Sequence, residues 1–167
     1  MKRNFKNPYV YLGIAIFMMV ILFISSSQTY HQQSQIGFLE TLLKNEPLKK
    51  PLSQIAFNYA GSEVSIAAKG YFSFVEFFIR KGAHFITYFI LGASLTLALY
   101  YRQKNFWWGG FFGLLSATGY AALDEFHQML TGDRTPLFQD VLLDMSGSLT
   151  AIFIILLYLL ATKKRLS

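Results

Sequence analysis

The sequence predicts an all-α integral membrane protein, a four-helix bundle with a re-entrant or interfacial amphipathic segment before its second span. Charged residues make up only 14% of the chain, well below the roughly 25% of an ordinary soluble domain. The apolar residues come in uninterrupted blocks, each close to the ~20 residues that a helix needs to cross a bilayer. At 167 residues the chain has the length of one domain. We therefore expect one membrane domain and no separate soluble one.

Four segments have the required length and almost no charge, namely 9–29, 84–101, 106–123 and 141–162. They divide the chain into an N-terminal span (1–30), an extracytoplasmic link with interfacial helices (31–80), a three-span region (81–162) and a basic tail (163–167). The first block follows Lys2 and Arg3, as a signal peptide would. It is longer than the 7–15 apolar residues of a signal peptide, and no A-x-A site follows. We expect an uncleaved first span.

Charge placement predicts the orientation of the spans. The N-terminus, the link between spans two and three, and the tail together hold eight Lys or Arg residues and no acid. Short basic segments face the cytoplasm, so both termini are expected inside a bacterial cell membrane crossed several times. The net charge of +6 then reflects topology and attraction to membrane lipid rather than binding to nucleic acid. Cysteine is absent, which excludes disulfides and thiolate zinc sites.

The long link between spans one and two has two apolar stretches. Ile36, Leu39, Leu42 and Leu43 have helical spacing, which favours a short helix lying in the membrane interface. Residues 72–79 form a dense aromatic and aliphatic run that is interrupted by Glu76. This second stretch is expected to be an in-plane helix or a shallow re-entrant element, serving mainly as a membrane-surface anchor.

The predicted functional centre is the polar stretch 124–147, which lies between the last two apolar blocks and holds five of the nine acids. On helices, Asp124 and Gln128 share one face at i,i+4, and Asp140 and Asp144 repeat this spacing. Thr131-Gly132-Asp133 and Thr135-Pro136 predict a tight loop between the two helices. Two acidic helix ends should therefore meet, with Arg134 in the loop between them.

A second polar motif opens span two. Lys81, His84 and Tyr88 stand at i, i+3 and i+7 and so share one helix face. Each has an ordinary explanation alone: Lys81 could reach lipid headgroups, Tyr88 could join the aromatic belt, and His84 could be a satisfied interface residue. Their occurrence together, at the expected depth of the acidic cluster, favours a shared site.

Asp144 admits two interpretations, because an ionised carboxylate one turn inside a span costs a few kcal/mol unless it is paired. It could belong to a buried structural ion pair with Lys81, Arg134 or His84. Alternatively, the acids and His84 act on a ligand, with adjacent Asp124 and Glu125 suited to acid–base chemistry. No cofactor is evident, although a divalent cation could be held by oxygen ligands, with a candidate set of His84, Glu125, Asp140 and Asp144.

Together these motifs resemble the VanZ-like membrane proteins. The resemblance is carried by K-x-x-H-F-x-x-Y, D-E-x-x-Q, a lone arginine and D-x-x-x-[ND]-x-x-G, in this order. Here they are Lys81, His84, Phe85, Tyr88, Asp124, Glu125, Gln128, Arg134, Asp140, Asp144 and Gly147. The resemblance covers about half of the chain, from Lys81 to the end of span four. Asp144 departs from the family, which often has Asn there.

The resemblance implies a setting rather than a mechanism. The family is named for a bacterial protein linked to low-level resistance to the glycopeptide teicoplanin, whose target is a cell-wall precursor outside the membrane. The first hypothesis is a non-catalytic envelope protein whose outward-facing cluster binds a lipid-linked or cell-wall component, such as a cell-wall precursor, or the glycopeptide, or simply locks the bundle. The alternative is an intramembrane hydrolase or transferase acting on a lipid-linked substrate, with Asp124 or Glu125 as base, and Lys81 and Arg134 binding a phosphate.

Overall fold

The computed structural model describes residues 6–131 and 136–164, so Arg134 and part of the predicted 131–136 loop lie outside the described residues. The chain is mostly helical, with one short hairpin. In chain order the elements are α1 (Pro8–Ser26), α2 (Tyr30–Gln33), α3 (Ile36–Leu42), α4 (Lys49–Leu52), β1 (Ala56–Tyr59), β2 (Ser62–Ser65), α5 (Ile66–Lys69), α6 (Tyr71–Gln103), α7 (Phe106–Leu130) and α8 (Phe138–Lys164).

Local sequence explains where the long helices begin. The Asn7 side chain accepts a hydrogen bond from the Tyr9 backbone N–H, and Pro8 occupies the first turn of α1, where its missing N–H has no cost. Asn105 likewise caps α7 by accepting from the N–H groups of Trp107 and Trp108. The preceding Lys104 has a φ of 58°, so only two residues turn the chain from α6 into α7.

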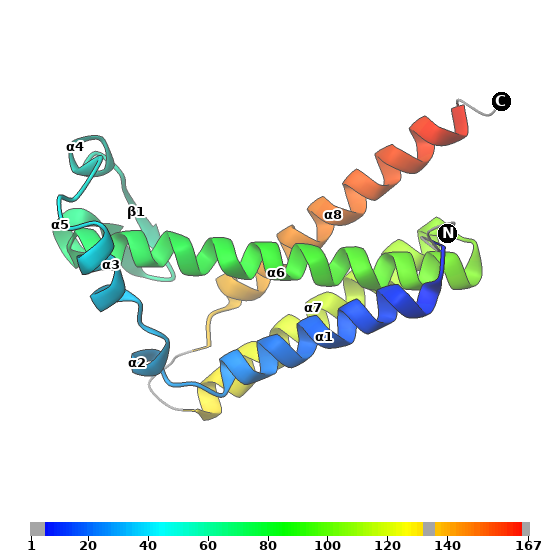
Figure 1. The fold of residues 1–167 in the computed structure, drawn as a ribbon, viewed down its shortest axis with the longest axis horizontal. Helices are drawn as coiled ribbons and strands as arrows, with labels where there is room; N and C mark the ends of the chain where they lie inside the picture. The colour runs from blue at the N-terminus through cyan, green and yellow to red at the C-terminus, as the bar shows by residue number, and fades with distance from the viewer. Residues whose placement is uncertain (1–5, 132–135, 165–167) are drawn as a thin grey trace.

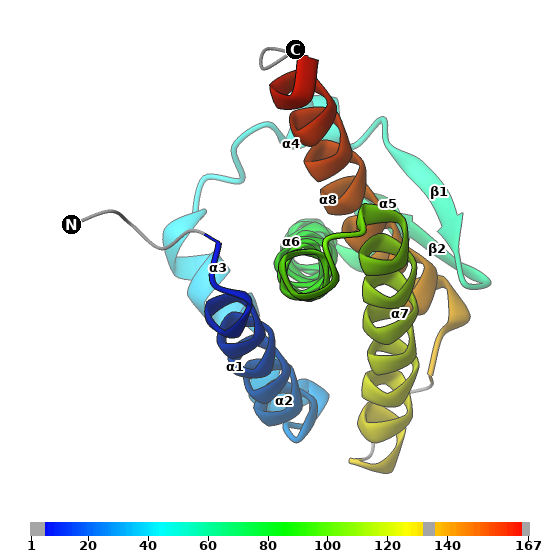
Figure 2. The ribbon, with the colours of Figure 1, turned by 90° about the vertical axis from the view of Figure 1, so that its right-hand side faces the viewer.

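Helix α6 lies at the centre of the arrangement and packs against α1, α7 and α8 (Figures 1 and 2). Helix α8 crosses α6 near its own N-terminus, and its C-terminal half then diverges from the other helices (Figure 1). The side chains of Phe153, Ile154, Leu157, Tyr158 and Leu160 are at least half exposed there. The structure thus has a central helix with three flanking helices, one of which splays outward, and the expected four-helix bundle is not confirmed.

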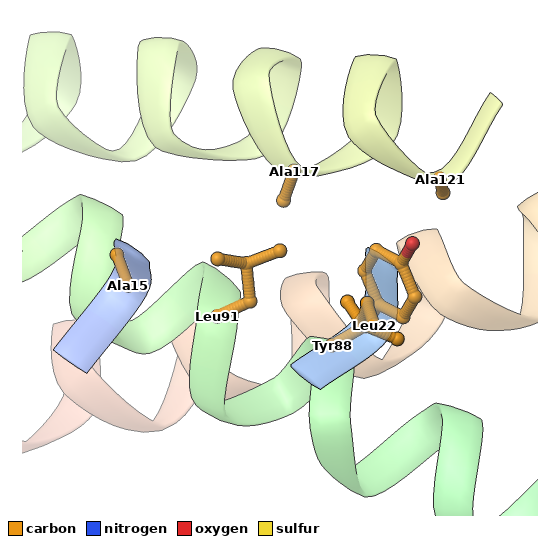
Figure 3. Packing of buried hydrophobic residues seen from close by; sticks show 6 residues of the cluster. All are labelled: Ala15, Leu22, Tyr88, Leu91, Ala117 and Ala121. Carbon is orange, nitrogen blue, oxygen red and sulfur yellow. The ribbon is translucent and has the colours of Figure 1, made fainter. Parts of the chain in front are cut away.

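Small residues allow the close approach of these helices. Figure 3 shows Leu91 and Tyr88 of α6 facing Ala117 and Ala121 of α7, with Ala15 and Leu22 of α1 beside them, and all six side chains are buried.

Glycines permit still closer backbone contacts between α6 and its neighbours. A Cβ atom at Gly113 would overlap the Thr96 side chain, and one at Gly147 would overlap the backbone carbonyl of Phe85. These two glycines are therefore packing sites, as is usual for small residues in membrane helices.

Three of the helices in the described part of the chain are long and apolar enough to cross a membrane: α1, α6 and residues Phe138–Thr162 of α8. Helix α7 has 25 residues, roughly 38 Å at 1.5 Å per residue, so its length would suffice. Its stretch 106–123 carries no charge, but four glycines and two tryptophans lower the mean hydropathy of that stretch. The fourth expected span is therefore not among the three candidates.

The expectation of a separate in-plane or re-entrant element at residues 72–79 is corrected by the structure. These residues form the first turns of α6, which continues without interruption to Gln103. A helix of 33 residues is roughly 50 Å long, whereas the hydrocarbon core is about 30 Å thick. The first turns of α6 can thus extend beyond the apolar layer and support the link.

The link contains a hairpin that the sequence reading missed, so the chain is not all-α. Strands β1 and β2 pair antiparallel, with Phe57 opposite Val64. The two turn residues Ala60 and Gly61 both have positive φ, 51° and 82°, as a type I′ turn requires. The expected short helix at Ile36–Leu42 is confirmed as α3, and its Leu39 is buried.

Candidate functional site

Three polar contacts join α6 to α8 in consecutive steps. The Lys81 Nζ lies 2.5 Å from Asp140 Oδ1, and His84 Nδ1 lies 3.5 Å from Asp144 Oδ2. One turn further along, the Ser148 hydroxyl donates to the backbone carbonyl of Tyr88 at 2.9 Å. The i, i+3, i+7 face of α6 predicted from the sequence therefore meets the i, i+4 acids of α8 residue by residue.

The deepest of these charges is Asp144, which is only 1% exposed. Neither of its oxygens has a hydrogen-bond partner among the described residues, and its charged neighbour is His84 at ion-pair distance. The hydroxyl of Tyr88 is also buried without a partner in this part of the chain. Of the partners considered for Asp144, His84 is the one that lies at ion-pair distance, whereas Lys81 pairs with Asp140 and Arg134 lies outside the described residues.

Asp124 connects α7 to α1. Its carboxylate accepts hydrogen bonds from the Ser26 hydroxyl and from Gln128 Nε2, the latter at 3.0 Å. Both Asp124 and Ser26 are buried. Thr131 adds a bond from its hydroxyl to the Ser26 carbonyl oxygen at 3.2 Å. This acid therefore fastens the end of the first helix to the end of α7.

Glu125 connects α7 to the start of α8. One of its carboxylate oxygens accepts a hydrogen bond from the backbone N–H of Leu137 at 3.0 Å. Leu137 immediately precedes α8, so the acid helps to fix the direction in which this helix begins. The adjacent acids Asp124 and Glu125 thus point to different partners.

The hairpin reaches the same cluster through Tyr59. Its hydroxyl donates to Asp140 Oδ1 at 2.5 Å, the oxygen that also accepts from Lys81. Burial, followed by the hydrogen bond to Asp140, raises the pKa of the Tyr59 phenol above its ordinary value. The phenol consequently stays a hydrogen-bond donor at physiological pH. The Lys81 ammonium also lies 4.9 Å from the Tyr59 ring centroid, which adds a cation–π contact.

Glu76 and Arg80, one turn apart on α6, hold the α2–α3 segment. The buried Glu76 carboxylate accepts from the Tyr30 hydroxyl, the Ser34 hydroxyl and the Gln35 backbone N–H. Arg80 stacks over the Tyr30 ring at 4.7 Å, and its Nη2 donates to Gln33 Oε1 at 3.3 Å. The lone acid in the aromatic run 72–79 is therefore an anchor for the link.

A cavity of about 490 Å³ lies between the link and the ends of α6, α7 and α8. It has three cations and three acids in its wall, together with two tyrosines: Lys69, Arg80, Lys81, Glu76, Glu125, Asp140, Tyr30 and Tyr59. Ser62 and Val64 of the hairpin, Ser73 and Phe77 of α6, Gln128 of α7 and Leu137 complete most of the remaining wall. Lys81 of the α6 motif and the acids Glu125 and Asp140 therefore line one cavity.

The described residues contain no group of three or more His, Cys, Asp or Glu side chains placed to hold a metal ion. In the candidate set, His84 pairs with Asp144, Asp140 pairs with Lys81, and Glu125 binds a backbone N–H. The hypothesis of a divalent cation thus receives no support from this arrangement.

Comparison with known families agrees with this geometry. The model of the VanZ/LLP1 family matches residues 11–160. The chain belongs to the VanZ/LLP1 family. The match extends well beyond the half of the chain in which the motifs were recognised, and includes α1, the link and the hairpin. No curated protein and no solved structure matches the chain. The family match and the three apolar helices identify a VanZ-like membrane protein.

The structure places eight of the nine predicted site residues of this VanZ-like chain, and Arg134 lies outside the described residues. Lys81, Glu125, Gln128 and Asp140 line the cavity, whereas Tyr88 and Asp144 are buried. His84 lies beside Asp144 and lines a neighbouring cavity of about 380 Å³. Asp124 faces α1. The sequence reading missed Ser26, Tyr59, Lys69 and Arg80. Arg80 is adjacent to the Lys81 motif, and Glu76 is the one acid in an aromatic run, so the sequence contains a signal for both residues. It contains none for Tyr59.

Proposed function

We propose that this VanZ-like protein is a non-catalytic membrane protein of the cell envelope that binds the head group of a lipid-linked cell-wall precursor in the cavity beneath the link. The main support for this proposal is the cavity. It has a volume of about 490 Å³, is lined by charged and tyrosine side chains, and lies at one end of helices that are apolar enough to span a membrane. Small-molecule sites have volumes of roughly 300–1,000 Å³, so a cavity of this size would hold part of such a head group.

The state of the acids supports binding over catalysis. Asp124, Glu125 and Asp140 each contact a residue of another part of the fold: Ser26 on α1, Leu137 before α8, and Lys81 on α6. A general base must reach the proton it removes from a substrate. These carboxylates instead hold helices and link together, so we assign them to building the cavity.

The proposal includes the orientation that the basic segments indicate. The cavity is lined by the first turns of α6. Figure 1 shows these turns at the end of α6 opposite its connection to α7, and Arg102 and Lys104 lie at that connection or in the last turn before it. If the basic segments are cytoplasmic, the cavity opens at the outer leaflet, on the side of the membrane where the cell wall lies.

Reporter fusions test this orientation. Alkaline phosphatase, which is active only outside the cytoplasm, should be inactive when fused after Lys104 or Ser167, and active when fused after Gly132. The physical reason is that short Lys- and Arg-rich segments are retained on the cytoplasmic side. Fusions of a cytoplasm-active reporter at the same sites provide the control. An inactive phosphatase at Gly132, with an active cytoplasmic reporter there, would place the cavity on the inner side and contradict the cell-wall setting.

Filling the cavity tests the binding function. Ser73 of α6 lines the cavity and takes part in none of the ion pairs described above. Ser73→Trp should therefore fill the space with an indole ring. Purified protein in detergent should bind a polyprenyl diphosphate that carries a disaccharide pentapeptide, measured by native mass spectrometry. We expect Ser73→Trp to reduce binding at least tenfold and Ser73→Ala to leave it unchanged.

Teicoplanin serves as the second probe in the same experiment. We expect Ser73→Trp to remove no saturable binding of teicoplanin, because the glycopeptide is not the ligand that we propose for the cavity. Loss of teicoplanin binding in Ser73→Trp, with no precursor binding by the unmodified protein, would make the glycopeptide the ligand. Binding of the precursor that is equal in Ser73→Trp and Ser73→Ala would show that the cavity is not its site.

A further inference from the structure

Resting on the proposed function, we propose that the cavity recognises its ligand through a phosphate group, held by Arg80 and Lys69. The inference assigns this role to residues that the sequence motif does not contain. The charged side chains in the cavity wall differ in whether they already have a partner within the protein, and those without one are available to bind a ligand.

Lys81, the cation of the motif, is neutralised within the protein. Its ammonium forms an ion pair with Asp140 at 2.5 Å, and it also lies within 5.5 Å of the ring centroids of Tyr59 and Phe77. Its side chain is only 23% exposed. A ligand anion would have to displace Asp140 to use this charge, and we therefore give Lys81 a structural role in the wall.

The acids of the wall are also occupied. Glu76 accepts three hydrogen bonds from the α2–α3 segment, Glu125 accepts from Leu137, and Asp140 accepts from Lys81 and Tyr59. Glu76 is 1% exposed and turned into these contacts. The cavity is therefore not a simple cation site, although its formal charges are equal in number.

Arg80 remains as a positioned donor. Its guanidinium is held by the Tyr30 ring and by Gln33, while its Nη1 is buried without a hydrogen-bond partner among the described residues. It lines this cavity and also a neighbouring polar one of about 380 Å³. A buried donor without an acceptor costs about 1–3 kcal/mol, and a planar guanidinium binds phosphate oxygens in a bidentate manner.

Lys69 supplies the second charge. It ends α5, at the mouth of the cavity, and its ammonium lies 5.5 Å from the Phe77 ring centroid. In the described part of the chain no carboxylate lies within ion-pairing distance of Lys69 or Arg80. Two separate cations suit a group with three terminal oxygens and up to two negative charges, whereas a carboxylate would be satisfied by Arg80 alone.

The experiment compares a polyprenyl monophosphate with the polyprenol of the same chain length, using purified protein in lipid nanodiscs. We expect the phosphate form to bind at least tenfold more tightly, because hydrogen bonds to charged groups contribute about 1.5–3 kcal/mol. Arg80→Gln and Lys69→Gln should each remove at least tenfold of the affinity for the phosphate form and leave polyprenol binding unchanged. Lys50→Gln, which removes an exposed lysine of the same link away from the cavity, should change neither.

Further measurements distinguish a lipid phosphate from free phosphate, and a loss of binding from a loss of fold. Inorganic phosphate should compete only at much higher concentration than the lipid; if it binds as tightly, the phosphate inference stands and the lipid part of the proposed function is contradicted. Arg80→Gln also loses the contacts with Tyr30 and Gln33, so its binding alone does not separate a lost charge from a lost fold. Two variants make this distinction: Lys69→Gln, which changes an exposed side chain, and Arg80→Lys, which keeps the charge.

Equal binding of polyprenyl monophosphate and polyprenol would overturn the phosphate inference. If Ser73→Trp still abolished binding of both, the proposed cavity function would survive that result. If Ser73→Trp bound both lipids as the unmodified protein does, the cavity function itself would fail.

Discussion

Replacing Gly147 with alanine is expected to lower the free energy of unfolding by at least about 2 kcal/mol, at the upper part of the 1–3 kcal/mol typical of overpacked cores. The added Cβ atom would overlap the carbonyl oxygen of Phe85 and lie 3.3 Å from the Phe89 backbone nitrogen. Both obstacles are backbone atoms of α6, so no side chain can rotate to make room. The helices α6 and α8 would have to separate, and the three polar contacts between them would lengthen.

The same substitution at Gly119 of α7 is the matched control. A Cβ atom there would have no neighbouring atom within 4 Å, and alanine favours a helix more than glycine does. Thermal unfolding in detergent should therefore show a lower midpoint for Gly147→Ala and an unchanged or slightly higher one for Gly119→Ala. Equal midpoints for the two variants would contradict the close approach of α6 and α8.

Replacing His84 with leucine is expected to destabilise the protein by about 3–5 kcal/mol, the range measured when one partner of a buried ion pair is removed. Asp144 is 1% exposed, and His84 is the charged group beside it. Without the imidazole, the carboxylate would remain in the interior of a membrane domain with no opposite charge, which is costly. Abundance in the membrane and the unfolding midpoint in detergent should fall together.

A double variant distinguishes the structural role of this pair from a catalytic one. His84→Leu combined with Asp144→Leu removes both charges and should recover most of the lost stability, because a well-packed apolar pair can replace a buried ion pair. Asp144→Asn alone should be tolerated, because the amide keeps the shape of the side chain and removes the charge that needs a partner. Normal stability of His84→Leu, together with a loss of function, would instead show that His84 acts on a ligand.

Helix positions and the pairing of motifs could be predicted because they rest on periodicity. The i, i+3, i+7 face of Lys81, His84 and Tyr88, and the i, i+4 acids of α8, follow from helix geometry alone. The membership in the VanZ/LLP1 family was likewise readable from these motifs and is confirmed by the match. To predict the contact between this face of α6 and the acids of α8, one needs only the further assumption that the two helices are neighbours.

The link could not be predicted because its structure depends on contacts distant in sequence. The hairpin turns at Ala60, a residue that rarely adopts positive φ, instead of at an Asn-Gly or Asp-Gly pair. Residues 72–79 were read as a separate element because Glu76 interrupts an apolar run, although the acid is satisfied by α2 and α3. The charge of Glu76 was visible, but its partners more than forty residues earlier were not.

Asp140 Oδ1 accepts from both the Tyr59 hydroxyl and the Lys81 ammonium. A single oxygen therefore belongs at once to the hairpin over the cavity and to the seam between α6 and α8. Any ligand that shifts Tyr59 must change the strength of the Lys81–Asp140 pair, and any change in the helix seam must alter how firmly the hairpin is held. By thermodynamic reciprocity the two effects are equal in free energy, so occupancy of the cavity and the tightness of the membrane helices are coupled quantities.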